Sequence, residues 1–219
     1  MSVVFGRGVE AILAILAFIL CLPVMAMVAL GVLTFLGWPV LFWQRRCGLG
    51  GRPFVMVKFR SMADRRDASG RLLPDNLRLG GFGRLLRRSR LDELPELLNV
   101  ATGSLAFIGP RPLLPETIAR YGDDGHRRCS VRPGLTGWAQ VSGNSLLSDQ
   151  DKLVLDLWYI EHRTIRLDLL IIWQTVRLLV GGERIVLNRI AAATKSGRKS
   201  NAISHGQSGI ALHRSNADQ

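Results

Sequence analysis

The feature that most constrains this chain is an uncharged apolar run near its N-terminus. From Ala11 to Trp43, 33 consecutive residues carry no charge, and Thr34 is almost the only polar side chain among them. As one straight helix the run would measure roughly 50 Å, whereas the hydrocarbon of a bilayer is about 30 Å thick. It is too long for a secretory signal and offers no clear A-x-A cleavage site. We therefore predict a retained membrane helix rather than a buried core helix.

Pro23 divides this run into apolar arms over 11–22 and 24–43. A proline removes one backbone donor and clashes with the preceding turn, so we expect a break or bend there. The first arm is too short to cross alone, which leaves a kinked span or a re-entrant helix that returns to its own leaflet. Because bases are denser after the run than before it, the positive-inside rule places the rest of the chain in the cytoplasm in both cases. The pattern alone leaves both geometries open.

Composition limits the partners and the fold. Lys plus Arg outnumber Asp plus Glu by 29 to 17, a net charge of +12, so we expect anionic partners. Three scattered cysteines exclude a disulfide framework and a tetrahedral zinc site. The hydrophobic fraction of 47% is too high for an intrinsically disordered protein. No nucleic-acid-binding module is recognisable, and the apolar anchor favours a membrane-surface role.

The expected organisation has three parts: a membrane-inserted segment over 1–44, a cytoplasmic catalytic domain over 45–193, and a disordered basic tail over 194–219. The middle part is predicted to be mainly α with small β elements. Residues 61–81 have the composition of a surface loop, and a helix is expected to start near Asp92. A second apolar segment, 165–180, contains charges, so it is predicted to pack on the core or to lie at the lipid interface.

Adjacent carboxylates after an arginine-rich segment are the densest chemical signal. Asp92 and Glu93 follow Arg84, Arg87, Arg88 and Arg90 in "GRLLRRSRLDELPELLNV". A helix N-terminus favours anions, so a substrate phosphate suits this place. Neighbouring helical positions point about 100° apart, which predicts different roles: one carboxylate attacks phosphorus and the other holds Mg²⁺. The alternative, which the local pattern favours, is a capping Asp with a first-turn Glu beside a solvated basic face.

Other chemical groups give weaker signals. Asp123 and Asp124 in "GDDG" are expected to form a turn rather than a metal site. Cys129 lacks a plausible base nearby in the sequence, and no P-loop or G-x-G-x-x-G fingerprint is present. Exposed structural roles are expected for the four histidines, which are His126, His162, His205 and His213.

Five ordered motifs together resemble the bacterial sugar transferase family, the monotopic phosphoglycosyl transferases. They are "RPFVMVKFRSM", "RLDELPELLNV", "FIGPRPLLPE", "VRPGLTGWAQVSG" and "LDLWYIEHRTIRLDLLII". The resemblance implies a minimal catalytic form that passes a sugar 1-phosphate from a UDP-sugar to undecaprenyl phosphate and releases UMP. It also implies a re-entrant anchor broken at Pro23, and so favours that geometry over a span.

By position, the resemblance implies that Asp92 is the nucleophile of a phosphosugar-enzyme intermediate and that Glu93 helps it to hold Mg²⁺. The positions that the resemblance implies bind substrate phosphate are Arg87, Arg111, Lys58, Arg60 and Arg128, and Asp156 matches a further family position near the site. Arg90 departs from the usual Ser before "LDE", and Cys129 replaces a frequent His. A non-catalytic membrane-anchored adaptor that binds anionic lipid or an acidic partner is the competing hypothesis.

Overall fold

The computed structural model describes residues 6–181 and 184–196, and it is mainly helical with two small sheets. The predicted fold class is confirmed to that extent. The helices and 3₁₀ turns before the carboxylates are α1 (Arg7–Leu36), η1 (Leu49–Gly51), α2 (Asp75–Arg78) and α3 (Gly81–Ser89). Those that follow are η2 (Leu91–Glu96), α4 (Leu97–Ala101), α5 (Pro115–Arg120), α6 (Gly122–Arg128), α7 (Trp138–Val141), η3 (Asn144–Leu146), α8 (Asp149–Glu161) and α9 (Ile165–Gly181).

Each sheet has two strands. The antiparallel pair β1 (Leu41–Cys47) and β2 (Pro53–Phe59) aligns Phe42 with Lys58 and Arg46 with Phe54. The parallel pair β3 (Ala106–Ile108) and β4 (Gly134–Thr136) joins segments far apart in the chain. Because side chains alternate along a strand, residues two apart share a face. Lys58 lies near the end of β2 and Arg60 directly follows the strand, and both line the cavity described below.

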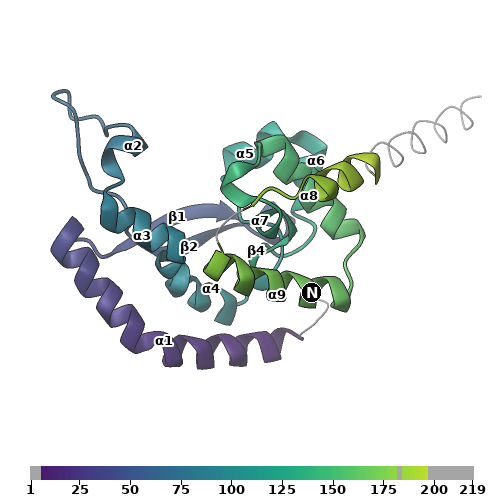
Figure 1. Ribbon diagram of the computed structural model, residues 1–219, viewed down its shortest axis with the longest axis horizontal. Helices are drawn as coiled ribbons and strands as arrows, with labels where there is room; N and C mark the ends of the chain where they lie inside the picture. The colour runs from purple at the N-terminus through teal and green to yellow at the C-terminus, as the bar shows by residue number, and fades with distance from the viewer. Residues whose placement is uncertain (1–5, 182–183, 197–219) are drawn as a thin grey trace, which may run out of the picture.

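Helix α1 is long, apolar and largely uncovered. It runs along one edge of the molecule and bends about midway (Figure 1), and Pro23 lies inside it. The helix continues through the proline, so the expected break is a bend. In the part of the chain that the structure describes, this is the one helix long and apolar enough to cross a bilayer. Exposed side chains such as Leu20 and Met27 suit contact with lipid, so α1 is compatible with membrane anchoring.

The apolar run is not helical to its end. Helix α1 stops at Leu36, and β1 begins at Leu41, inside the segment expected to form the second apolar arm. Gly37 ends the helix at a φ of 77°, a left-handed conformation that glycine adopts without a Cβ clash. Pattern alone missed this end because the strand that follows is also apolar.

Both arms of α1 pack on segments that flank the carboxylates. Ala14 in the first arm packs with Val100 and Leu105. In the second arm, the buried side chains Val28 and Val32 form a cluster with Phe59 and Leu86. The anchor therefore touches α4, β2 and α3, the elements around the candidate site.

The other half of the core lies among β3, α7, α8 and α9, where Leu155, Tyr159 and Ile171 are buried. Helix α9 packs one side on this core, as one of the two expectations had it, while Leu169 and Trp173 stay exposed. Residues 187–196 are helical, so the first three residues of the predicted tail, 194–196, continue a helix. Residues 197–219, with His205 and His213, lie outside the described residues.

Candidate active site

A sharp turn places the carboxylates beside the arginines of α3. Helix α3 ends at Arg90, whose φ of 56° and ψ of 18° are left-handed, and η2 starts at the next residue. Such a conformation in a non-glycine residue costs about 1–3 kcal/mol and tends to occur at functional sites. The reversal lets Arg87 of α3 and Asp92 of η2 line one cavity of about 1130 Å³.

The capping interpretation of the carboxylates is wrong. Arg90, not Asp92, occupies the N-cap position of η2, and no side chain caps the turn. Asp92 is only 7% exposed and Glu93 only 8%, and both line the cavity. Buried carboxylates in a basic cavity point to chemistry rather than to a solvated surface.

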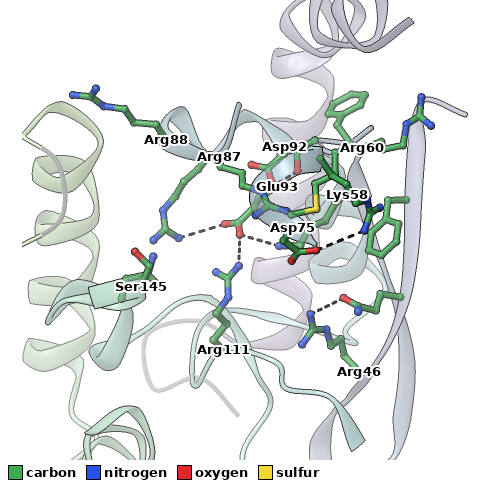
Figure 2. Close-up of a pocket in the computed structure, with 18 of the residues that line it drawn as sticks. Arg46, Lys58, Arg60, Asp75, Arg87, Arg88, Asp92, Glu93, Arg111 and Ser145 are labelled. Carbon is green, nitrogen blue, oxygen red and sulfur yellow. Dashed lines mark hydrogen bonds and ion pairs between the residues drawn. The ribbon is translucent and has the colours of Figure 1, made fainter. Parts of the chain in front are cut away.

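Glu93 is the centre of an ion-pair group (Figure 2). Its Oε1 accepts from Lys58 Nζ at 2.9 Å and from Arg111 Nη2 at 2.7 Å, and its Oε2 accepts from Arg90 Nη1 at 3.4 Å. Burial alone would raise the pKa of Glu93, but the charges of Arg111, Lys58 and Arg90 outweigh it and hold that pKa far below its usual range. Glu93 is therefore ionised throughout the physiological range.

Asp92 is tuned in the opposite direction. Burial, followed by the negative charge of Glu93, raises the pKa of Asp92 to about 6, although Lys58, Arg87 and Arg111 act against the shift. At neutral pH most of this carboxylate is ionised, yet it is more basic than an ordinary aspartate. The two neighbours thus have different electrostatic roles, as the sequence predicts.

Lys58 connects the carboxylates of η2. Its Nζ lies 2.9 Å from Glu93 Oε1 and 2.9 Å from Oε1 of Glu96, which is 3% exposed. Burial raises the pKa of Glu96. Sequence reasoning missed Glu96, although its place one turn after Asp92 was a usable signal.

The matched arginines fall into two sets. Arg87 and Arg111 line the cavity, and Arg87 Nε donates to Ser61 Oγ at 3.0 Å. Arg128 lies behind the cavity wall, where its Nε and Nη2 donate to Asp156 Oδ2 at 2.9 and 2.7 Å and its Nη2 donates to the Arg111 carbonyl at 2.5 Å. The structure therefore brings Arg128 and Asp156 to the support of Arg111 rather than to the cavity.

Arg60 has a further task beside the cavity. Its Nη2 donates to the carbonyl oxygens of Leu36 and Gly37 at the end of α1. These carbonyls lack intrahelical partners, so Arg60 caps the C-terminal end of α1.

Arg46 of β1 is a cavity residue that sequence reasoning used only as a topology charge. Phe42, Gln44 and Arg46 line the cavity from one face of the strand, which their two-residue spacing predicts. Arg46 Nη2 donates to Gln44 Oε1 at 2.5 Å, and burial and the charge of Arg111 lower the pKa of Arg46. Two guanidinium groups that repel each other in a cavity favour a bound anion.

The segment predicted as a surface loop also reaches the cavity. Arg66 and Leu72 form an antiparallel bridge, and Asp75 and Arg78 line the cavity from α2. Sequence gave no signal for these two residues, because their position depends on how the loop folds back.

The donor chemistry at the cavity suits Mg²⁺. This ion usually takes one or two protein carboxylates together with phosphate oxygens and water, and Asp92 and Glu93 offer carboxylates of this kind on one wall. Within residues 6–181 and 184–196, no group of three or more His, Cys, Asp or Glu side chains forms a complete metal site. Asp123 and Asp124 lie in the first turn of α6, away from the cavity lining, and Asp124 pairs with Arg127 at 3.0 Å.

Comparison with known proteins decides the family. The family model described as bacterial sugar transferase matches residues 1–182. The chain belongs to this family. It is 48% identical over 150 residues to "Uncharacterized sugar transferase EpsL" of Bacillus subtilis, covering 68% of this chain and 74% of that protein.

Longer relatives carry more specific names. The UDP-glucose:undecaprenyl-phosphate glucose-1-phosphate transferase of Xanthomonas campestris is 39% identical over 183 residues, covering 78% of this chain and 38% of that protein. The UDP-N-acetylgalactosamine-undecaprenyl-phosphate N-acetylgalactosaminephosphotransferase of Aeromonas hydrophila is 33% identical over 184 residues, covering 80% of this chain and 44% of that protein. This chain therefore spans less than half the length of these two family members.

Proposed function

We propose that this chain transfers a sugar 1-phosphate from a UDP-sugar to undecaprenyl phosphate and releases UMP. This is the first step in assembling an exopolysaccharide, capsule or O-antigen repeat. The observation that carries the proposal is the pair of buried carboxylates in one arginine-lined cavity, and the opposite directions of their pKa shifts support it. Names of relatives support the same donor and acceptor classes.

The reaction has two displacements at one phosphorus. An Asp92 oxygen attacks the sugar-bearing phosphorus, the bond from that phosphorus to the bridging oxygen breaks, and UMP leaves with the electron pair. An oxygen of undecaprenyl phosphate then attacks the aspartyl phosphosugar, and the Asp92 carboxylate is regenerated. The pKa of about 6 suits both steps, because the carboxylate is ionised for attack and still leaves readily.

The cations of the cavity stabilise the charge that develops during both steps. Arg111 and Lys58 already hold Glu93, and Arg87 and Arg46 line the same cavity. Donors fixed before the reaction need little reorganisation when the phosphoryl group gains charge. Asp92 and Glu93 would hold Mg²⁺, which when bound neutralises charge on the diphosphate.

Placement follows from the acceptor. Undecaprenyl phosphate keeps its chain in the bilayer, so a catalyst meets its head group at the surface. We place α1 as a re-entrant helix in the inner leaflet of the bacterial inner membrane, with the cavity on the cytoplasmic face. The exposed apolar surface of α1 and its contacts with both sides of the site support this placement.

The proposal is tested with detergent-solubilised protein, undecaprenyl phosphate and Mg²⁺. UDP-glucose and UDP-N-acetylgalactosamine head the donor panel, because relatives are named for these sugars, and UDP-galactose and UDP-N-acetylglucosamine complete it. We expect UMP release, and a mass increase of one phosphosugar when donor is added alone and acyl phosphates are preserved. Asp92→Asn should remove both signals. Asp123→Asn, a carboxylate change in α6, is the matched control and should leave both unchanged. If no donor yields either UMP or an adduct, the non-catalytic adaptor is favoured.

A further inference from the structure

One buried charge of α1 has no place in the proposed chemistry. Glu10 is the acidic residue in the first turn of this apolar helix, and its side chain is 1% exposed. Its Oε2 accepts from Nη2 of Arg132, which lies 122 positions further along the chain and is 9% exposed. Removing a carboxylate from water is costly unless a cation pairs with it. The pair therefore ties the start of the membrane helix to the catalytic part of the chain.

Arg132 is itself held by the backbone just before the second sheet. Its Nη1 donates to the Leu105 carbonyl at 3.3 Å, and the next residue, Pro133, accepts at 2.8 Å from the backbone N–H of Ala106. The same region holds the first arm of α1 in two further ways. Ala14 is fully buried against Val100 and Leu105, and a Cβ on Gly103 would lie only 3.0 Å from Nε of Arg7.

The opposite end of α1 is fixed separately, since Arg60 caps the carbonyls of Leu36 and Gly37. A straight helix from Glu10 to Leu36 would be about 39 Å long at 1.5 Å per residue, more than the roughly 30 Å of hydrocarbon. With Leu36 held at the catalytic side, a straight α1 would carry Glu10 to the far side of the bilayer. The ion pair with Arg132 then cannot form, so the pair is compatible with the bent helix alone.

We propose that Glu10 and Arg132 form a topology latch, an ion pair that keeps the first arm of α1 on the catalytic side and so selects the re-entrant arrangement over a span. The inference rests on the membrane placement proposed above. Pro23 allows the bend, and the latch fixes where the first arm goes. Release of the arm would break this ion pair and carry the Glu10 carboxylate through the hydrocarbon, and both costs oppose it.

The test uses a single reporter thiol at the N-terminus. Ser2→Cys is introduced with Cys21→Ala, and intact spheroplasts are treated with a membrane-impermeant maleimide before and after permeabilisation. The latch predicts labelling only after permeabilisation. Cys47 and Cys129 are buried and serve as an internal background.

Glu10→Arg separates the latch from the general charge rule. It adds positive charge before the apolar run, so the positive-inside rule alone predicts even firmer retention of the N-terminus. The latch predicts the reverse, because two arginines now face each other, and the externally labelled fraction should rise about tenfold or more. Arg132→Glu should do the same. The double variant Glu10→Arg with Arg132→Glu should restore protection, which excludes simple misfolding as the cause.

Arg127→Glu is the matched control for Arg132→Glu. Arg127 pairs with Glu161 at 2.7 Å on the surface, so the same charge change there should leave labelling unchanged. Protection retained in both Glu10→Arg and Arg132→Glu, or labelling that the double variant fails to reverse, would overturn the latch. UMP release by the wild-type chain is measured separately. A wild-type chain with latch-dependent labelling and no UMP release would therefore contradict only the proposed activity.

Discussion

Two groups of arginine–carboxylate ion pairs lie side by side in this fold, and they differ in how exposed their side chains are to solvent. We call the group around Glu93 the open group and the pair of Arg128 with Asp156 the closed group. Around Glu93, three cations share one carboxylate on a cavity wall, and the Arg111 side chain remains 38% exposed. Behind that wall, Arg128 and Asp156 pair one to one and are 4% and 2% exposed. Because Arg46 and Arg87 line the same cavity, the first group lies in a surplus of positive charge that an incoming phosphate can use. The second has no spare charge, so it holds the loop that presents Arg111.

The largest expected effect concerns the open group. Asp92→Asn keeps the shape of the side chain and removes the proposed nucleophile, so we expect UMP release to fall about a thousandfold or more. The adduct in intact mass spectra should also disappear. Turnover within tenfold of the wild type would assign the nucleophile to another residue.

Asp156→Asn breaks the closed group. Losing one charge of a buried pair typically costs about 3–5 kcal/mol, here because Arg128 would remain buried without its counter-charge. We expect a correspondingly lower free energy of unfolding by urea denaturation. Glu161→Gln, in the next turn of α8 and in a surface pair, is the control. If Asp156→Asn left the free energy of unfolding nearly unchanged, the pair of Arg128 with Asp156 would not stabilise the fold more than a surface pair does.

The raised pKa of Asp92 links activity to stability. The group titrates near 3.8 when unfolded and near 6 when folded, so folding favours its neutral form and the free energy of unfolding falls as pH rises through this window. The difference amounts to about 3 kcal/mol at most. Asp92→Asn should therefore stabilise the protein at pH 8, and its advantage should vanish below pH 4. Thermal unfolding at both pH values measures this, and an unchanged difference between them would contradict the pKa shift.

Arg111→Lys tests the exposed member of the open group. Lysine keeps the charge but loses the planar fork that can hold Glu93 and a phosphate together. We expect kcat/KM for the UDP-sugar to fall about 10- to 100-fold, with little change in unfolding. If the free energy of unfolding fell along with kcat/KM, Arg111 would instead support the fold, as Arg128 and Asp156 do.

The smallest effect is expected for a surface pair. Arg127 contacts Asp124 at 3.0 Å and Glu161 at 2.7 Å while 47% exposed. Arg127→Ala should change the free energy of unfolding by less than about 1 kcal/mol, because water screens such pairs. A larger loss in the free energy of unfolding would show that solvent exposure does not determine how much each ion pair of this chain contributes to stability.

Local pattern predicted what depends on local chemistry. The long apolar helix with Pro23 inside it follows from hydropathy, and the unlike electrostatics of Asp92 and Glu93 agree with the expectation that neighbouring carboxylates differ. Pattern alone nevertheless favoured a surface cap for the carboxylates, because burial is not visible in a short window. The resemblance to a family corrected that preference.

Contacts between segments that are distant in sequence could not be predicted from local sequence patterns. Glu10 and Arg132, Arg60 and the end of α1, and Arg128 and Asp156 are paired by tertiary folding alone. Arg128 matched a family position near the site, but a sequence match does not show whether a side chain points into the cavity or away from it. The structure alone separates residues that face the cavity from those that support its wall.

The guanidinium of Arg60 has a consequence beyond capping. It ties the last carbonyls of α1 to the residue that directly follows β2, the strand that carries Lys58. In the proposed re-entrant placement, this contact would couple the depth of α1 in its leaflet to the height of Asp92 and Glu93 above the lipid head groups. With that placement, changing the lipid chain length should change the rate of the proposed reaction as well as the attachment of the chain to the bilayer.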